Sequence, residues 1–221
     1  MKDIENKIKD AYKESKHIYD DVLTANSFWS KAYNKLAWGM KDEDYVPTLL
    51  SFIPNDFNGK MLDVPVGTAV FTSSKYKTIK NADITALDYS TDMLSQAEKR
   101  FKDLKINNIK CVQGDVSNLP FETGSFDLVL SMNGFHAFPN KETAFKETAR
   151  VLKKDGIFCG CFYISGERKT TDFIVTKVLM PKGWFTPPFY TKDEVPKILD
   201  KLYTKMEIYI MKSIVYFRCI K

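Results

Sequence analysis

The strongest constraint on the fold of this chain is a short apolar run that ends abruptly in a proline and a glycine. Met61 to Val64 has the character of a buried strand, and Pro65 and Gly67 end it. The next residues, Thr68 to Phe71, are able to start a helix. This order predicts a strand, a tight turn and a helix. Such a turn leaves the first backbone N–H groups of the helix unpaired and pointing into a crevice.

Asp63, near the end of the apolar run, would place an acceptor at the floor of that crevice. A carboxylate there suits a ligand with an ammonium group or hydroxyls better than a ligand with a phosphate. The same stretch also fits an ordinary β-α turn with a helix cap. The turn alone does not decide between these interpretations, so the decision rests on the rest of the chain.

Composition and charge favour an ordinary soluble globular protein. The 221 residues are 44% hydrophobic and 28% charged, and the net charge of +5 comes from lysines scattered among acids. This pattern argues only weakly for nucleic acid or an anionic membrane as a partner and fits a solvated surface, so no nucleic-acid partner is expected. No apolar run approaches the roughly twenty residues that cross a bilayer, and Met1 to Asp10 is too charged for a secretory signal. We therefore expect a cytoplasmic protein without stable membrane insertion.

Cysteine and histidine are too few and too scattered to predict a metal site. The only histidines are His17 and His136, and the four cysteines form no C-x-x-C pair. Cys159 and Cys161 share one face of a predicted strand, where small buried core residues are expected rather than a disulfide.

The N-terminal part of the chain predicts a helical cap over residues 1–56. Residues 4–23 repeat apolar side chains every three or four positions, and residues 42–53 predict a further helix that Pro54 stops. The aromatic stretch between them, Phe28 to Trp38, fits packing of this cap on the main domain. It also fits a wall over a ligand crevice.

From residue 57 onward, strands and helices alternate. Further strands are expected at 83–88, 109–112, 126–130 and 157–164, with helices at 91–104 and 140–153. This alternation predicts right-handed crossovers and a mostly parallel sheet. Near the C-terminus, Thr191 and Glu194 form a capping box for a helix over 191–203. Two β-rich runs, 205–212 and 213–220, then predict a hairpin that adds an antiparallel strand at one edge.

Polar residues recur where the predicted strands end. Asp88 ends the second strand, 21 positions after Gly67, which is the spacing of an acid that accepts both hydroxyls of an adenosine ribose. Asp115 ends the third strand and would accept from an adenine amine, while the Val116 N–H meets a ring nitrogen. Each acid alone also fits a helix cap or a solvated loop. Their repetition at successive strand ends points to one binding crevice.

The sequence resembles a known family, the class I S-adenosylmethionine-dependent methyltransferases. Within this family it resembles the type 11 group, which includes ubiquinone and menaquinone biosynthesis methyltransferases. The resemblance covers roughly residues 28–163. Its motifs are LDVPVGTA (62–69), ITALDYSTDML (84–94), CVQGDVSNLPFETGSFDLVLS (111–131) and FKETARVLKKDGIF (145–158). The family implies a Rossmann-like, doubly wound α/β fold. Its sheet has seven mostly parallel strands, with an antiparallel C-terminal hairpin strand, here within residues 57–221.

Carried over by position, the resemblance implies S-adenosylmethionine as cofactor. The turn would hold the methionine part of the cofactor, and Asp88 would hold its ribose hydroxyls. Tyr89 would lie against the adenine, and Ser131 would line the floor of the site near the sulfonium. The implied cofactor-binding residues are Asp63, Val64, Pro65, Gly67, Thr68, Asp88, Tyr89, Asp115, Val116 and Ser131.

The turn departs from the family pattern D-x-G-x-G-x-G at two of its three glycines. Pro65 and Ala69 stand there, and a proline neither adopts positive φ nor donates a hydrogen bond. Ala69 adds a methyl where helix and strand pack closely. We expect cofactor binding to survive, because the acids and Gly67 remain.

Methyl transfer requires alignment of the acceptor and exclusion of water, and it needs a base only when the acceptor arrives protonated. His136, just beyond the fourth strand, is the candidate base, although a structural or pocket-lining role fits this histidine better. An aromatic insert at about 165–190 would help to enclose the acceptor. The expected pocket residues are Trp29, Tyr33, Trp38, Phe135, Phe138, Trp184 and Phe185.

This pocket predicts a methyltransferase that acts on a small, partly apolar molecule. Two alternatives remain: a protein that binds the cofactor without turnover, and a nicotinamide-dependent oxidoreductase. The altered turn motivates the first. The missing G-x-G-x-x-G motif and the acid at Asp115 weigh against the second.

Overall fold

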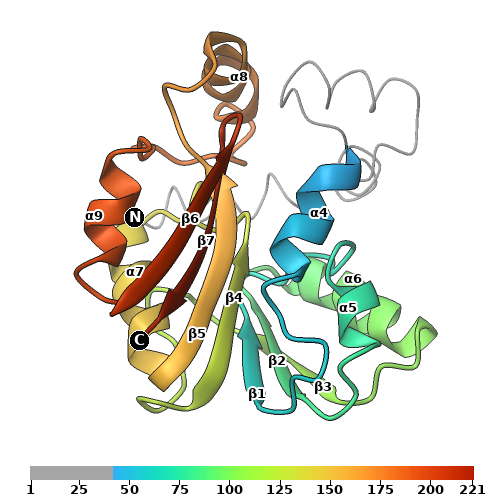
Figure 1. Ribbon diagram of the computed structural model, residues 1–221. Coiled ribbons are helices and arrows are strands. Elements are labelled where there is room, and N and C mark those ends of the chain that lie inside the picture. The colour runs from blue at the N-terminus through green and yellow to red at the C-terminus, as the bar shows by residue number, and fades with distance from the viewer. Residues whose placement is uncertain (1–41) are drawn as a thin grey trace.

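The computed structural model describes residues 42–221 of the chain, and Figure 1 shows how they are arranged. A seven-stranded sheet lies at the centre, in the order β3-β2-β1-β4-β5-β7-β6. Its strands are β1 (Lys60–Asp63), β2 (Asp83–Asp88), β3 (Ile109–Gln113), β4 (Phe126–Met132), β5 (Leu152–Tyr163), β6 (Lys205–Met211) and β7 (Ile214–Ile220). The expected Rossmann-like α/β fold with a mostly parallel sheet is thereby confirmed.

The strand order reverses between β1 and β4, and this reversal positions the crevice. β1 pairs in parallel with β2 on one side and with β4 on the other. The connections leave in opposite directions, so the loops at the carboxyl ends of these two strands separate. The turn that follows β1 therefore lies at the point where open α/β sheets bind ligands.

Helices cover both faces of the sheet and bury two separate core layers (Figure 1). On one face lie α4 (Asp42–Leu50), α5 (Ser73–Tyr76) and α6 (Thr91–Asp103). On the other lie α7 (Lys141–Val151) and α9 (Glu194–Leu199). The amphipathic pattern of α6 explains its placement, because Met93, Leu94, Ala97 and Phe101 are all buried.

The C-terminal hairpin forms as predicted and extends the sheet beyond β5. β7 pairs antiparallel with β5, and β6 pairs antiparallel with β7 as the outer strand. The inner strand β7 is almost entirely buried, whereas β6 is largely exposed. Burial on both faces accounts for the apolar composition of β7.

Two elements differ from the sequence-based expectation. The helix expected directly after the turn begins only at Ser73, because residues 68–72 form successive turns. The strand expected at 157–164 begins earlier, at Leu152 of β5, and carries an irregularity where Asp155 has φ 61° and the register with β4 shifts. The capping contact at α9 is present, since the Thr191 N–H donates to Glu194 Oε2 over 2.8 Å.

The predicted N-terminal helices and the residues Trp29, Tyr33 and Trp38 lie outside the described part of the chain. The division into a cap and a main domain therefore remains a prediction. Between residues 42 and 221, no helix has the length and apolar character needed to cross a membrane.

Gly160 lies in β5 where this strand packs closely against β4 and β7. A Cβ placed there would lie 2.4 Å from the backbone oxygen of Ser131 and 2.6 Å from Phe217 Cζ. We expect Gly160→Ala to lower the free energy of unfolding by about 3 kcal/mol, since a backbone atom of the neighbouring strand cannot move aside. Chemical denaturation measures this loss. Adding Phe217→Leu should relieve only a minor part of it, and full recovery would mean that the ring alone sets the limit.

Candidate active site

A cavity of about 220 Å³ opens at the carboxyl ends of the first four strands. It is lined by the turn after β1, by the ends of β2 and β4, by the loop after β3 and by the segment before α7. Nine predicted cofactor-binding residues lie on its wall, namely Asp63, Val64, Pro65, Gly67, Thr68, Asp88, Tyr89, Asp115 and Val116. The fold thus brings together the strand-end residues that are distant in sequence.

Backbone hydrogen bonds from both neighbouring strands hold the turn after β1. The Val64 N–H donates to the Leu130 carbonyl over 2.9 Å, and the Val66 N–H donates to the Leu87 carbonyl over 2.9 Å. The Gly67 N–H donates to Asp88 Oδ2 over 2.8 Å. The path of the turn is therefore fixed by β4 on one side and by β2 on the other.

Asp88 joins this turn to the start of α6. Its second oxygen, Oδ1, accepts from the Ser90 N–H over 2.8 Å, and the Ser90 hydroxyl in turn caps α6. Only 7% of the Asp88 residue is exposed. Burial raises the pKa of Asp88 to about 6, although the hydrogen bonds from Ser90 and Gly67 lower it. Each oxygen keeps a further lone pair for a ligand hydroxyl.

Asp63 is fully buried at the floor of the cavity, and Tyr76 holds it from α5. The Tyr76 hydroxyl donates to Asp63 Oδ2 over 2.5 Å. Burial raises the pKa of Asp63 to about 7, and the negative charge of Asp88 adds to this shift. The sequence predicted the position of this acid but not its tyrosine partner.

The two departures from the glycine-rich pattern have different consequences. Pro65 lies on the cavity wall after a cis peptide bond and packs against the loop after β4. A Cβ at Gly134 would come within 2.5 Å of Pro65 Cδ, so a glycine is required opposite the proline ring. Positive φ occurs at Gly67 (56°) and at Ala69 (55°). The alanine therefore adopts a left-handed conformation that a glycine would adopt without strain.

The loop after β3 presents Asp115 and Val116 to the cavity. Asp115 is exposed, and its Oδ1 accepts from the Ser117 N–H over 2.8 Å. Val116 is buried and belongs to the core layer under α7. Its side chain anchors the loop, while the exposed acid stays available for a ligand.

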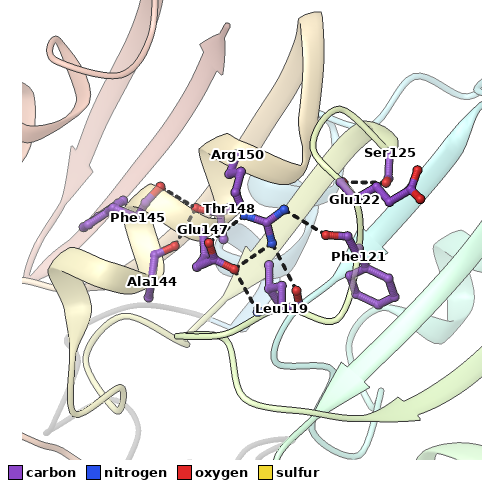
Figure 2. Close-up of polar contacts among 9 residues, drawn as sticks. All are labelled: Leu119, Phe121, Glu122, Ser125, Ala144, Phe145, Glu147, Thr148 and Arg150. Atoms are coloured by element: carbon purple, nitrogen blue, oxygen red, sulfur yellow. Dashed lines mark hydrogen bonds and ion pairs between the residues drawn. The ribbon is translucent and has the colours of Figure 1, made fainter.

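Arg150 of α7 holds the continuation of this loop (Figure 2). Its guanidinium donates to the carbonyls of Phe121 (2.8 Å) and Leu119 (3.0 Å) and forms two contacts with Glu147. Glu147 Oε2 also accepts from the Leu119 N–H over 2.9 Å. The motifs LPF and RVLK are therefore joined in space, and their contacts place the loop that carries Asp115.

Ser131 and Phe135 do not lie on the cavity wall. Ser131 is completely buried in β4, where it pairs with Gly160 of β5. Met132 and Asn133 instead line the cavity at the end of this strand. Phe135 turns into the core under α7 and stacks on Phe145 with a ring separation of 3.8 Å. Of the described residues predicted for the acceptor pocket, Phe138 lies on the wall.

His136, the candidate base, is also absent from the described cavity wall. Its Nδ1 accepts from the Tyr163 N–H over 3.2 Å, and its ring stacks on Phe185 at 4.0 Å. Burial and the nearby Lys141 lower the pKa of His136 to about 3. A lone pair that already accepts from a backbone amide is not available to take a proton from an acceptor. The geometry therefore indicates a structural role.

Lys141, a residue that sequence patterns did not single out, holds the aromatic insert in place. Its buried ammonium group donates to the carbonyls of Phe138 (3.0 Å) and Thr186 (2.6 Å). Burial lowers the pKa of Lys141 to about 8. The insert contains α8 (Lys169–Ile174) and the π-helix η1 (Val175–Leu179). Trp184 and Phe185 follow η1 without reaching the described cavity wall.

The described residues contain no cluster of three or more histidine, cysteine or acidic side chains that could hold a metal ion. Wall residues that were not among the predicted site residues include Phe71, Thr72, Met93, Met132, Asn133 and Asn140. Only Asn133 carried a usable signal. Its φ of 60° suits asparagine better than most residues, and it lies three positions after the strand expected at 126–130.

We expect Arg150→Met to lower the free energy of unfolding by about 2 kcal/mol, because two carbonyls and Glu147 lose a charged donor. Urea denaturation measures the change. Lys146→Met on the same helix is the matched control, since the Lys146–Glu142 pair is exposed and such pairs contribute less than about 0.5 kcal/mol. Equal losses in both variants would contradict the assigned role of Arg150.

Stability should fall as the pH rises from about 4 toward 7. The folded protein binds protons at Asp63 and Asp88 more tightly than the unfolded chain does, because both pKa values are raised on folding. Each carboxyl then contributes at most about 1.4 kcal/mol of lost stability per pH unit. Denaturation of the ligand-free protein at several pH values measures the slope. Asp63→Asn should make it shallower, and an unchanged slope would show that Asp63 does not titrate there.

Comparison with known proteins finds a matching family and several relatives. Residues 62–160 match a family described as a methyltransferase domain. A demethylmenaquinone methyltransferase of Staphylococcus haemolyticus is 41% identical over 99 residues, which are 44% of this chain and 41% of the relative. An uncharacterized chloroplast methyltransferase of Arabidopsis thaliana is 26% identical over 204 residues, covering 86% of this chain and 54% of the relative. The chain thus spans about half the length of these relatives.

Among solved structures, phosphoethanolamine N-methyltransferase 2 of Haemonchus contortus has a similar fold. Its TM-score is 0.74 at 16% identity, and the match covers 97% of this chain and 60% of that one. At this identity the likeness concerns the fold alone. Residues 62–160 therefore match a methyltransferase domain, and the described part of the chain shares a Rossmann-like fold with this S-adenosylmethionine-binding methyltransferase.

Proposed function

We propose that this protein binds S-adenosylmethionine in the cavity at the switch point and transfers its methyl group to a small, partly apolar molecule. The observation that carries the proposal is the convergence of Asp63, Asp88 and Asp115 on one cavity within a methyltransferase domain. The three acids leave successive strands, so they are spaced along the crevice as a nucleoside with an amino-acid tail requires.

The residues on the wall fit this cofactor part by part. Asp88 keeps lone pairs that we assign to two ribose hydroxyls, and we assign the exposed Asp115 to an adenine amine. Asp63 has a buried oxygen without a hydrogen-bond partner in the described chain. The cavity of about 220 Å³ is smaller than the roughly 300 Å³ at which small-ligand pockets begin. S-adenosylmethionine would therefore not fit wholly inside the cavity. It would extend outward past Tyr89, which is 42% exposed.

The bound cofactor supplies a methyl group that its sulfonium has already activated. The contribution of this chain is to hold the two reactants in line and to exclude water from the reacting atoms. Apolar side chains near the end of β4, such as Met132 and Phe138, provide a dry wall there. Since His136 is turned away, we propose an acceptor that needs no base from this histidine.

The identity of the acceptor is proposed only as a class. The name of the staphylococcal relative refers to a quinone, which agrees with an acceptor that has an apolar part. Another relative, from rice, is named for a phytyl hydroquinone. Because this chain covers under half of both proteins, their own substrates do not transfer to it directly.

Calorimetry with S-adenosylhomocysteine tests the cofactor assignment. We expect Asp88→Ala to weaken binding by at least about tenfold, because two hydrogen bonds to a charged acceptor are lost. Asp103→Ala is the matched control, since this acid is exposed at the end of α6 and away from the cavity wall. Unchanged affinity in Asp88→Ala would contradict the assignment of the ribose site, provided that its thermal unfolding shows a folded protein.

Turnover requires a separate measurement. Transfer of a radiolabelled methyl group to a panel of hydroquinones, phenols and amines should show product with at least one acceptor that has an apolar part. Binding of the cofactor without transfer to any acceptor would instead favour a non-catalytic binding protein. Stabilisation by NADH and not by S-adenosylhomocysteine would favour an oxidoreductase, because a ligand at a hundred times its Kd adds about 2.7 kcal/mol to stability.

A further inference from the structure

The carboxyl group of Asp63 is held on one side only. Asp63 Oδ2 accepts the Tyr76 hydroxyl over 2.5 Å, whereas Oδ1 is buried without a hydrogen-bond partner in the described chain. Asp63 and Tyr76 are both fully buried, and Asp63 lines the cavity. A buried acceptor without a partner is costly unless a ligand supplies a donor. The unused lone pairs of the buried Oδ1 thus indicate where a ligand donor belongs.

The groups around Asp63 leave it without a compensating positive charge. Tyr76 and Thr72 face it from the α5 side, and Asp88 lies on β2. Cys111 of β3 and Cys159 of β5 are the further titratable groups that interact with it electrically. Lysine and arginine are absent from the described groups that shift the pKa of Asp63. Since two acids are buried together, the site favours a cationic ligand over an anionic one.

Thr72 provides a second unused group beside this carboxyl. Its hydroxyl is buried on the cavity wall and makes no hydrogen bond of standard geometry in the described chain. It nevertheless lies close enough to lower the pKa of Asp63. A carboxylate oxygen and a hydroxyl at one corner of a cavity match an ammonium group, which carries several donors.

We propose that Tyr76 is a positioning residue for the cofactor. It fixes one oxygen of Asp63 so that the other receives the ammonium group of the bound ligand, and ligand binding displaces a proton from this carboxyl. The inference rests on the proposed function, because it assigns a residue and a proton to the same site. Tyr76 does not itself line the cavity and acts through Asp63.

The chemistry of this arrangement predicts how affinity varies with pH. The pKa of Asp63 in the ligand-free protein is raised to about 7 by burial, so the carboxyl is mostly neutral at pH 6. An ammonium group binds the ionised form, and the proton competes with it below that pKa. Affinity should therefore rise roughly five- to tenfold from pH 6 to pH 7.5. It should level off above that pH, where the α-amino group of the ligand itself begins to lose its proton.

Isothermal titration with S-adenosylhomocysteine at pH 6.5, in two buffers that differ in ionisation enthalpy, counts the protons released on binding. We expect the wild-type protein to release more than half a proton per bound ligand. Asp63→Asn should remove most of this release, because an amide has no proton to lose. Methylthioadenosine, which has the nucleoside but no ammonium group, is the matched ligand control and should displace little or none.

Tyr76→Phe tests the role of the tyrosine itself. Its hydroxyl lowers the pKa of Asp63, so its loss should move the pH at which affinity rises to a higher value. A purely structural tyrosine would reduce stability and affinity without moving this pH midpoint. Asp63→Asn, which keeps Tyr76, remains informative if the Phe variant does not fold.

Two outcomes separate this inference from the proposed function. Failure of S-adenosylhomocysteine to bind at any pH would overturn the proposed function, and the inference with it. Binding with a pH-independent affinity, and with no more proton release than methylthioadenosine causes, would overturn the inference while leaving the cofactor site in place.

Discussion

The cavity at the strand ends depends on how β1 is held between its two neighbours, β2 and β4. β1 has only four residues, Lys60–Asp63, but it pairs with β2 and β4 along its length. The same two partners continue to bind the chain beyond the strand, through the carbonyls of Leu130 and Leu87. Because both sides are fixed, the turn follows one path, and the acids of β1 and β2 face the same cavity. A ligand site at this point is a consequence of strand order.

Hydrogen bonds between distant segments then hold the loop after β3 and the segment before α7, which both line the cavity. Arg150 ties the loop after β3 to α7, and Lys141 ties the aromatic insert to the segment before α7 (Figure 2 shows the first of these contacts). Both cations donate to backbone carbonyls of loop segments, which helps to satisfy their hydrogen-bonding capacity. Their role is to place the cavity wall, so changes in either residue reach the site indirectly.

Pro65 and Ala69 show how a family pattern can change while the path of the turn persists. The proline ring lies against Gly134, where a side chain would collide with it, so the loop after β4 accommodates the substitution. Ala69 has φ 55° in a buried position, which costs roughly 1–2 kcal/mol relative to glycine. The buried methyl group recovers part of that cost by packing in the core.

Sequence patterns determined the class of fold, the parallel strands, the C-terminal hairpin and the strand ends that carry Asp63, Asp88 and Asp115. They did so because apolar periodicity and turn residues act locally, and because a parallel sheet places equivalent strand ends at one edge. Only the tertiary structure decided the orientation of His136, the burial of Ser131 and Phe135 and the Tyr76–Asp63 contact. The hydrogen bonds of Asp63 and His136, for example, join residues that are 13 and 27 positions apart, and local patterns do not encode such contacts.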